Sequence, residues 1–156
     1  MSITCEVGDK APHFHLAIGE QKHASLKDYR GRKLVLYFYP KDDTSGCTVE
    51  ALGFNALKAQ FESAGTSVLG VSPDPLKAHA KFREKYALDI ELGSDESKET
   101  LKAYGVWVEK SMYGRKYMGV ERTTFLIGAD GKIVRVWRKV KASKHADEVL
   151  QTAQAI

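Results

Sequence analysis

The sequence has little cysteine, little proline and no long apolar segment. Its 156 residues include 2 cysteines and 4 prolines. Two cysteines do not form the disulfide framework of a small secreted domain, so we expect free thiols that serve either packing or chemistry. No apolar run approaches the ~20 residues that a membrane-spanning helix needs. The first ten residues lack the apolar core of a secretory signal, so we expect a cytoplasmic protein with no membrane partner.

An excess of charge of one sign is also missing. The net charge is +4, from 24 lysines and arginines against 20 aspartates and glutamates. Basic residues gather between 132 and 144, but those up to 138 alternate with apolar residues, as on the wet side of a strand. The sequence contains no recognisable nucleic-acid-binding module, so we expect no nucleic-acid partner. His13 and His15 lack an evident third ligand, so we expect no metal and no cofactor.

The chain has the length and composition of one globular domain. We find no internal repeat, low-complexity tract or linker, and we expect residues 1–156 to form a single domain. Residues 34–39 are a continuous apolar run that predicts a central strand, which Pro40 ends. Residues 47–64 repeat apolar side chains at helical spacing, and residues 67–71 predict a second strand. This strand–helix–strand unit should be right-handed with parallel strands.

The second half of the chain changes the type of sheet. Asp74 is a fair N-cap for the next helix, and Pro75 suits its first turn. Two strand patterns, 123–127 and 132–137, flank an Asp-Gly turn and predict an antiparallel hairpin. We therefore expect an α/β protein with a mixed central sheet, helices on both faces and a thioredoxin-like architecture. The segment that holds Met112, Tyr113, Tyr117 and Met118 either rims the active site or covers the sheet.

The best candidate for chemistry is Cys47. The loop of residues 40–46 follows the first strand, at the edge where open α/β sheets bind ligands, and Cys47 begins the next helix. A helix N-terminus favours an anion, and the thiolate is the reactive form of cysteine. The helix contributes only ~0.3–1 kcal/mol, less than the ~2 pKa units needed to ionise an ordinary thiol at neutral pH. A cation is therefore needed, and Arg122, which enters a strand expected near the first one, is the candidate.

These residues carry a resemblance to a known family. Pro40, Thr44 and Cys47 stand at the spacing of the Pro-x-x-x-Thr-x-x-Cys signature of peroxiredoxins. Residues 37–50 and 119–127 are similar to the bacterioferritin-comigratory, or PrxQ, subgroup, and the similarity extends from residue 8 to residue 131. The resemblance implies an antioxidant enzyme, a thioredoxin-dependent thiol peroxidase that reduces hydrogen peroxide and organic hydroperoxides.

The resemblance also implies a role for each matching residue. Cys47 would be the nucleophile that becomes a sulfenic acid, and Arg122 would stabilise the thiolate and the displaced oxygen. Thr44 would form hydrogen bonds with the thiolate and the peroxide, while Pro40 would shield the pocket. Charge on the leaving oxygen is the reason why donors aimed there lower the barrier. Glu50 either orients Arg122 or is an acidic residue of the first helical turn without a catalytic part.

The sequence departs from the subgroup at the second cysteine. Many relatives carry a resolving cysteine five residues after the first, where this chain has Leu52, and others carry it on a helix in the region of residues 75–86, where this chain has none. Whether Cys5 resolves oxidised Cys47 stays open. We favour a one-cysteine enzyme that thioredoxin, glutaredoxin or a small thiol reduces, and we expect a monomer, as is often found in this subgroup.

Two other functions are alternatives. A disulfide oxidoreductase normally uses Cys-x-x-Cys, and this chain has threonine at position 44 where the first cysteine would stand. A redox sensor would use Cys47 as a reporter, and it would consume peroxide stoichiometrically without turnover. Peroxide consumption over many turnovers therefore separates the enzyme from the sensor.

Overall fold

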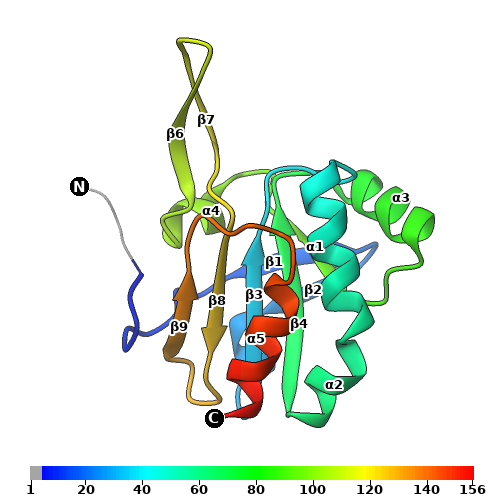
Figure 1. Cartoon of the computed structure of the whole chain (residues 1–156), viewed down its shortest axis with the longest axis vertical. Helices are drawn as coiled ribbons and strands as arrows, with labels where there is room; N and C mark the ends of the chain where they lie inside the picture. The colour runs from blue at the N-terminus through cyan, green and yellow to red at the C-terminus, as the bar shows by residue number, and fades with distance from the viewer. Residues whose placement is uncertain (1–4) are drawn as a thin grey trace.

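The computed structural model describes residues 5–156. A mixed seven-stranded sheet lies at its centre, in the order β2-β1-β5-β4-β3-β8-β9 (Figure 1). The strands of this sheet are β1 (His15–Gly19), β2 (Lys22–Ser25), β3 (Lys33–Phe38), β4 (Thr66–Ser72), β5 (Glu91–Ser94), β8 (Thr123–Ile127) and β9 (Ile133–Trp137). A separate antiparallel ribbon, β6 (Trp107–Met112) with β7 (Arg115–Val120), projects from the body of the molecule.

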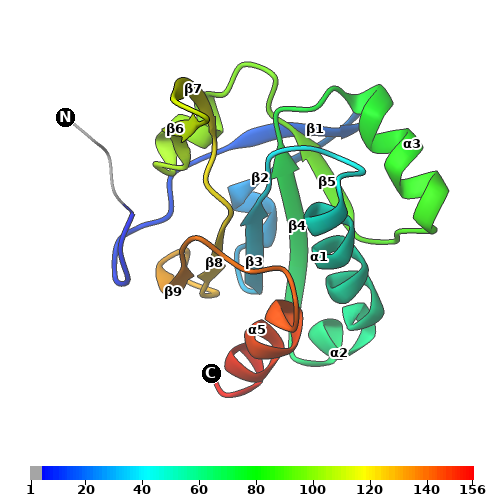
Figure 2. The ribbon, with the colours of Figure 1, turned by 45° about the horizontal axis from the view of Figure 1, so that its top comes forward.

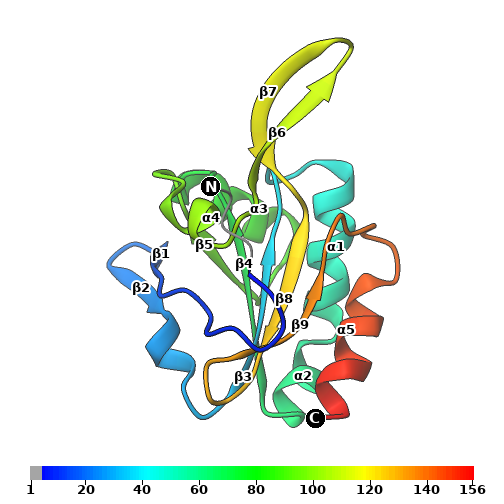
Figure 3. The ribbon, with the colours of Figure 1, turned by 90° about the vertical axis from the view of Figure 1, so that its left-hand side faces the viewer.

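Helical elements cover both faces of the sheet. They are η1, a 3-10 helix (Leu26–Tyr29), α1 (Ser45–Ala56), α2 (Lys58–Ser63), α3 (Leu76–Tyr86), α4 (Glu99–Ala103) and α5 (His145–Gln154). In Figure 3, α1, α2 and α5 lie against one face, while η1 and α4 lie on the other side. No helix in the described part of the chain is long and apolar enough to cross a membrane.

Strand β3 separates two apolar clusters because its side chains alternate between the faces of the sheet. Leu34, Leu36 and Phe38 belong to the cluster that contains Cys5. Val35 and Tyr37 belong to the other cluster, which contains Cys47, Phe54 and Phe61. The continuous apolar run at 34–39 is thus explained by burial on both faces, as expected for a central strand. The two cysteines lie in different clusters, on opposite faces of the sheet.

The predicted pairing of the central strands is confirmed. β3 pairs in parallel with β4, and it pairs antiparallel with β8, which in turn forms the hairpin with β9. β4 also pairs in parallel with β5. The right-handed arrangement of parallel strands around α1 therefore coexists with an antiparallel edge, and the sheet is mixed rather than purely doubly wound.

Two local predictions were wrong. The single helix expected over 47–64 is divided, because Leu57 leaves helical geometry with φ −101° and ψ 7°, and α1 starts two residues earlier, at Ser45. Asp74 does not cap α3, whose N-cap is Pro75. The Asp74 carboxylate instead accepts hydrogen bonds from the Asp42 amide and the Ser72 hydroxyl. A capping preference is a local signal, and here long-range hydrogen bonds outweigh it.

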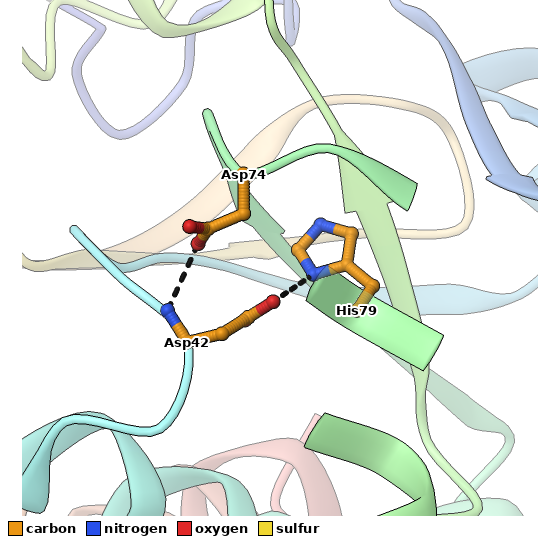
Figure 4. A group of neighbouring side chains, drawn as sticks. All are labelled: Asp42, Asp74 and His79. Carbon is orange, nitrogen blue, oxygen red and sulfur yellow. Dashed lines mark hydrogen bonds and ion pairs between the residues drawn. The ribbon is translucent and has the colours of Figure 1, made fainter. Parts of the chain in front are cut away.

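The loop of residues 40–46 lies beside α3 (Figure 2), and Asp42 of this loop contacts Asp74 and His79 (Figure 4). Asp42 Oδ2 lies 2.6 Å from Nδ1 of buried His79, whose Nε2 lies 3.1 Å from the Gly93 carbonyl oxygen. Tyr39 donates its hydroxyl to the second oxygen of the same carboxylate. Asp42, Asp74 and His79 are spaced closely enough to hold a cation, but each offers atoms already engaged in these hydrogen bonds. We therefore interpret the cluster as an anchor for the loop that precedes Cys47.

Candidate active site

Cys47 is the third residue of α1 and is only 1% exposed. The N-cap of this helix is Thr44, whose extended backbone (φ −91°, ψ 156°) directs its carbonyl oxygen to the Thr48 amide at 2.8 Å. The Thr44 hydroxyl donates to the carbonyl oxygen of Lys41 at 2.9 Å. Pro40 stands half-buried where β3 ends and the loop begins. The loop therefore delivers the thiol to the positive end of the helix dipole.

Arg122 bridges two groups on α1. Its Nη2 donates to Cys47 Sγ at 3.1 Å, and its Nη1 donates to Glu50 Oε1 at 2.6 Å. The fork geometry of guanidinium suits such a double contact. Burial alone would lower the pKa of Arg122, but Glu50 and Cys47 together outweigh it and raise the pKa above its usual value. A β-carbon on Gly46 would lie 3.2 Å from Nη2, so glycine at this position leaves room for the guanidinium.

The register of the sheet explains why residue 122 meets residue 47. In the antiparallel pair of β3 and β8, Thr123 lies opposite Phe38. The residue before β8 therefore lies beside the carboxyl end of β3, where the Cys47 loop starts. The Arg122 carbonyl oxygen also accepts a hydrogen bond from the Val140 amide at 3.0 Å, which holds this backbone in place. The expectation that Arg122 lies near the thiol agrees with this geometry.

Glu50 has two interpretations from the sequence, and the structure favours one of them. It lies three positions after Cys47, on the same side of the helix, and its side chain is buried against Arg122. Burial raises the pKa of Glu50 to about 7, although Arg122 acts in the opposite direction. Its second oxygen, Oε2, is buried without a hydrogen-bond partner, as is the Tyr37 hydroxyl. Glu50 is therefore an interior partner of Arg122, which favours the interpretation that it orients the arginine.

Tyr37 forms the floor beneath this pair. Its ring stacks on Phe54 with centroids 4.7 Å apart, and Gly70 stands opposite it in the β3–β4 register. A β-carbon on Gly70 would lie 2.6 Å from the Tyr37 ring, so only glycine leaves space for the tyrosine. Burial first, and the Glu50 carboxyl second, raise the pKa of Tyr37 well above its usual value. The site therefore has a water-poor floor, in which an unpaired charge is costly.

The Glu50 carboxyl should make folding stability depend on pH. Its pKa is about 7 in the folded chain against an ordinary value of 4.5, so between these values the folded state holds a proton that the unfolded state has released. The corresponding stabilisation is complete below about pH 4.5 and is lost as pH rises through 7. We expect Glu50→Gln to remove this loss, so the free energy of unfolding of the variant, minus that of wild type, should increase from pH 4.5 to 8.

Urea unfolding at several pH values measures this difference. His145 has a pKa lowered to about 4, chiefly by burial, and it gives the opposite slope, with stability gained as pH rises from about 4 to 6.5. Because His145 is present in both proteins, its contribution cancels in the difference. A difference that stays constant across the pH range would contradict the buried, proton-binding state of Glu50.

The segment around residues 112–118 either rims the active site or covers the sheet, according to its sequence, and the structure separates these alternatives. It forms the projecting β6–β7 ribbon, on which Met112, Tyr113, Tyr117 and Met118 are all exposed. The alternative that these side chains cover the sheet is therefore wrong. Figures 1 and 3 show the two strands projecting together from the body of the molecule. Because β7 ends at Val120, the base of the ribbon runs directly into Arg122 and borders the site.

The site contains a buried cysteine at the start of a helix. An arginine beside the carboxyl end of the central strand donates a hydrogen bond to its sulfur. This arrangement is typical of a thiol-based redox enzyme. A family model described as the AhpC/TSA family matches residues 7–136. The chain belongs to this family. It is 50% identical over 148 residues to the putative peroxiredoxin bcp of Coxiella burnetii, with 95% of this chain and 98% of that protein covered. Peroxiredoxin Bcp of Bacillus subtilis is 43% identical over 150 residues, with 96% of each chain covered.

Solved structures place the fold in the same group. PrxQ from Xylella fastidiosa has a TM-score of 0.93 at 42% identity, and 99% of this chain and 98% of that chain are covered. The bacterioferritin comigratory protein of Xanthomonas campestris, studied for its alkyl peroxide reduction activity, has a TM-score of 0.87 at 43% identity, with 91% and 90% covered. The fold is therefore thioredoxin-like, as expected, and the chain is an enzyme of the peroxiredoxin type, a thiol peroxidase.

Proposed function

We propose that the chain reduces hydrogen peroxide and organic hydroperoxides at Cys47 and is restored by a thiol from outside the chain. The observation that carries the proposal is the 3.1 Å hydrogen bond from Arg122 to Cys47 Sγ at the start of α1. The alkyl peroxide reduction of the related Xanthomonas protein supports the organic substrates. In the first step the thiolate attacks one peroxide oxygen, the O–O bond breaks, and the alkoxide or hydroxide that leaves takes up a proton.

Each site residue has a part in this proposal. Arg122 stabilises the thiolate before the attack and the negative charge on the leaving oxygen during it. Thr44 binds the peroxide after its hydroxyl turns from the Lys41 carbonyl, which it contacts at 2.9 Å, toward the substrate. Pro40 lacks an N–H donor and shields the thiol from water. Glu50 is a positioning residue, because it holds the other arm of the Arg122 fork at 2.6 Å.

The second half of the cycle requires an external thiol. Cys5 and Cys47 are the two cysteines of the chain, and they belong to apolar clusters on opposite faces of the sheet. Cys5 is 4% exposed, and its Sγ lies 3.5 Å from the carbonyl oxygen of Ala103. A disulfide needs α-carbons within about 7 Å, and the sheet between the two clusters keeps these residues apart. This separation supports a one-cysteine cycle in which the sulfenic acid waits for a reductant.

Turnover of a Cys5→Ala variant tests the proposal. We expect it to consume peroxide over many turnovers at the wild-type rate when an external thiol is supplied. Intact mass after one equivalent of peroxide should show one added oxygen on Cys47 in both proteins, and non-reducing electrophoresis should show no Cys5–Cys47 bond. A bond between these residues, together with lost turnover in the variant, would make Cys5 the resolving cysteine. Stoichiometric consumption without turnover would favour the redox sensor.

We further propose a reductant, a cellular location and an oligomeric state for the enzyme. Thioredoxin, glutaredoxin or a small thiol serves as the reductant, and the enzyme works in the cytoplasm as a monomer. Residues 1–156 act as one domain, which the seven-stranded sheet from residue 15 to residue 137 supports. Peroxide consumption with each reductant in turn, and the mass of the protein in solution, test these statements separately.

A further inference from the structure

A groove lies beside Arg122, on the outer side of the candidate active site. It has a volume of about 510 Å3 and is bordered by the β6–β7 ribbon and by residues 139–140. This volume falls within the ~300–1,000 Å3 that ligand pockets occupy. Its cationic lining comes from Lys110, Arg122 and Lys139. Apolar contact area in the same groove comes from Val108, Tyr117 and Val140.

Lys110 is fixed at the base of the ribbon rather than extended into solvent. It is half-buried, and a β-carbon on Gly119 would lie 3.2 Å from Lys110 Cδ, so the glycine gives the lysine stem its place. Burial first, and the Arg122 guanidinium second, lower the pKa of Lys110, while the Glu121 carboxylate acts in the opposite direction. The ammonium group is therefore held near a second positive charge. Two neighbouring cations at a groove wall attract a shared anion.

Lys139 closes the groove from the other side. The next residue, Val140, donates its amide to the Arg122 carbonyl oxygen at 3.0 Å, which places this segment against the site. Two carboxylates also line the groove, Glu109 and Glu121, and Glu109 lies 3.9 Å from Lys116. Among residues 5–156, neither Lys110 nor Lys139 lies within 4 Å of a carboxylate oxygen. Both ammonium groups are thus available to an anion.

We propose that Lys110 and Lys139 bind the carboxylate of a small thiol that reduces oxidised Cys47. This inference rests on the proposed function, because it names the class of the external reductant. Cys47 is 1% exposed, so a slender molecule reaches its sulfur more easily than the surface of a protein does. The carboxylate would lie between the two lysines, and the aliphatic part of the thiol would contact Val108 and Tyr117 on its way to Arg122.

The chemistry balances with two molecules of this thiol. The first attacks the sulfenic sulfur of Cys47, forms a mixed disulfide and releases the sulfenic oxygen as water. The second attacks the thiol-derived sulfur of the mixed disulfide, and Cys47 leaves as the thiolate. Two thiols are oxidised to one small disulfide for each peroxide that is reduced. Arg122, which donates to Cys47 Sγ at 3.1 Å, stabilises the leaving thiolate in this step.

A matched pair of thiols tests the inference. The protein is oxidised with one equivalent of hydrogen peroxide and is mixed with 3-mercaptopropionate or with its methyl ester, and each rate is corrected to the concentration of thiolate. We expect wild type to prefer the carboxylate by about 3- to 10-fold at low salt, with the preference decreasing as salt screens the lysines. In Lys110→Met/Lys139→Asn the ratio should fall to about 1. Methionine keeps the stem at Gly119, and asparagine tolerates the left-handed backbone of residue 139, where φ is 51°.

Two controls separate binding of the reductant by the groove lysines from two other effects. One effect is binding of the peroxide, and the other is the net positive charge of the protein. Lys132→Met removes an exposed lysine at the far end of β9 and should keep the wild-type ratio. A carboxylate-bearing hydroperoxide and its methyl ester are compared in the oxidation step. A lysine-dependent preference there, and not among the thiols, would overturn the assignment to the reductant. Equal rates for the two thiols in wild type, or a preference that survives in the double variant, would also overturn it. Failure of hydrogen peroxide to oxidise Cys47 would instead count against the proposed function.

Discussion

Replacement of Cys47 by serine is expected to lower the rate of peroxide turnover by at least about 10⁴-fold. A serine hydroxyl does not ionise near neutral pH, so no nucleophile is left at the start of α1. The fold should survive, because the hydroxyl is similar in size and Arg122, 3.1 Å from the sulfur in wild type, is placed to donate to it. Peroxide consumption with an external thiol measures the effect, and circular dichroism and urea unfolding check the fold.

The matched control for this variant is Cys5→Ala. It also removes a buried thiol, but from the apolar cluster on the other face of the sheet. If the chemistry belongs to Cys47, only the variant at position 47 loses turnover. Substantial turnover in Cys47→Ser would place the reactive sulfur elsewhere than the geometry of α1 indicates. A comparable loss in Cys5→Ala would show that turnover needs both thiols.

Replacement of Arg122 by alanine should give the second largest loss. Loss of one preorganised donor to a developing oxyanion typically costs about 10²–10³-fold in rate, and we expect oxidation of Cys47 by hydrogen peroxide to slow by that factor. The thiolate also loses the cation that donates to its sulfur, so alkylation of Cys47 by iodoacetamide should slow in the variant. Stopped-flow oxidation and the rate of alkylation measure the two effects separately.

Arg122→Lys sharpens this test. Lysine keeps the positive charge but replaces the fork with a single ammonium group, so it does not reproduce the contacts to Cys47 Sγ at 3.1 Å and Glu50 Oε1 at 2.6 Å together. We expect a rate between those of wild type and Arg122→Ala. Unchanged oxidation and alkylation in the alanine variant would remove Arg122 from the site. Equal rates for Arg122→Lys and wild type would show that the charge matters and the geometry of the fork does not.

Part of the candidate site could be predicted from single positions along the chain. Cys47 follows a strand-ending proline and a turn-rich loop, a local pattern that indicates a helix N-terminus at a ligand-binding edge. The need for a cation pointed to Arg122, and the antiparallel pairing of β3 with β8 explains why that choice agrees with the structure. Glu50 could not be assigned in the same way, because its partner depends on a side-chain contact that spans 72 residues of sequence.

Other features of the site depend on packing that no local pattern encodes. The Thr44 hydroxyl faces the Lys41 carbonyl in this conformation, which a preference for helix caps does not predict. The Tyr37 hydroxyl and Glu50 Oε2 are buried without hydrogen-bond partners, because Phe54 and Gly70 pack closely around the Tyr37 ring. The groove beside Arg122 arises only when the β6–β7 ribbon and residue 139 meet.

The sequence by itself determined the central strands, the Cys47 loop, the helix that follows it and the membership of the family, because each is written in contiguous residues. The tertiary structure decided the rest. β1 and β5 are short, and their pairing in the sheet depends on partners far along the chain, as in the pair of Ala17 with Ser94. The Asp74 carboxylate accepts a hydrogen bond from the distant Asp42 amide instead of capping α3, and the expected long helix is divided at Leu57. At Asp74 a long-range contact outweighed a capping preference of about 1 kcal/mol, which is why the local pattern alone did not reveal it.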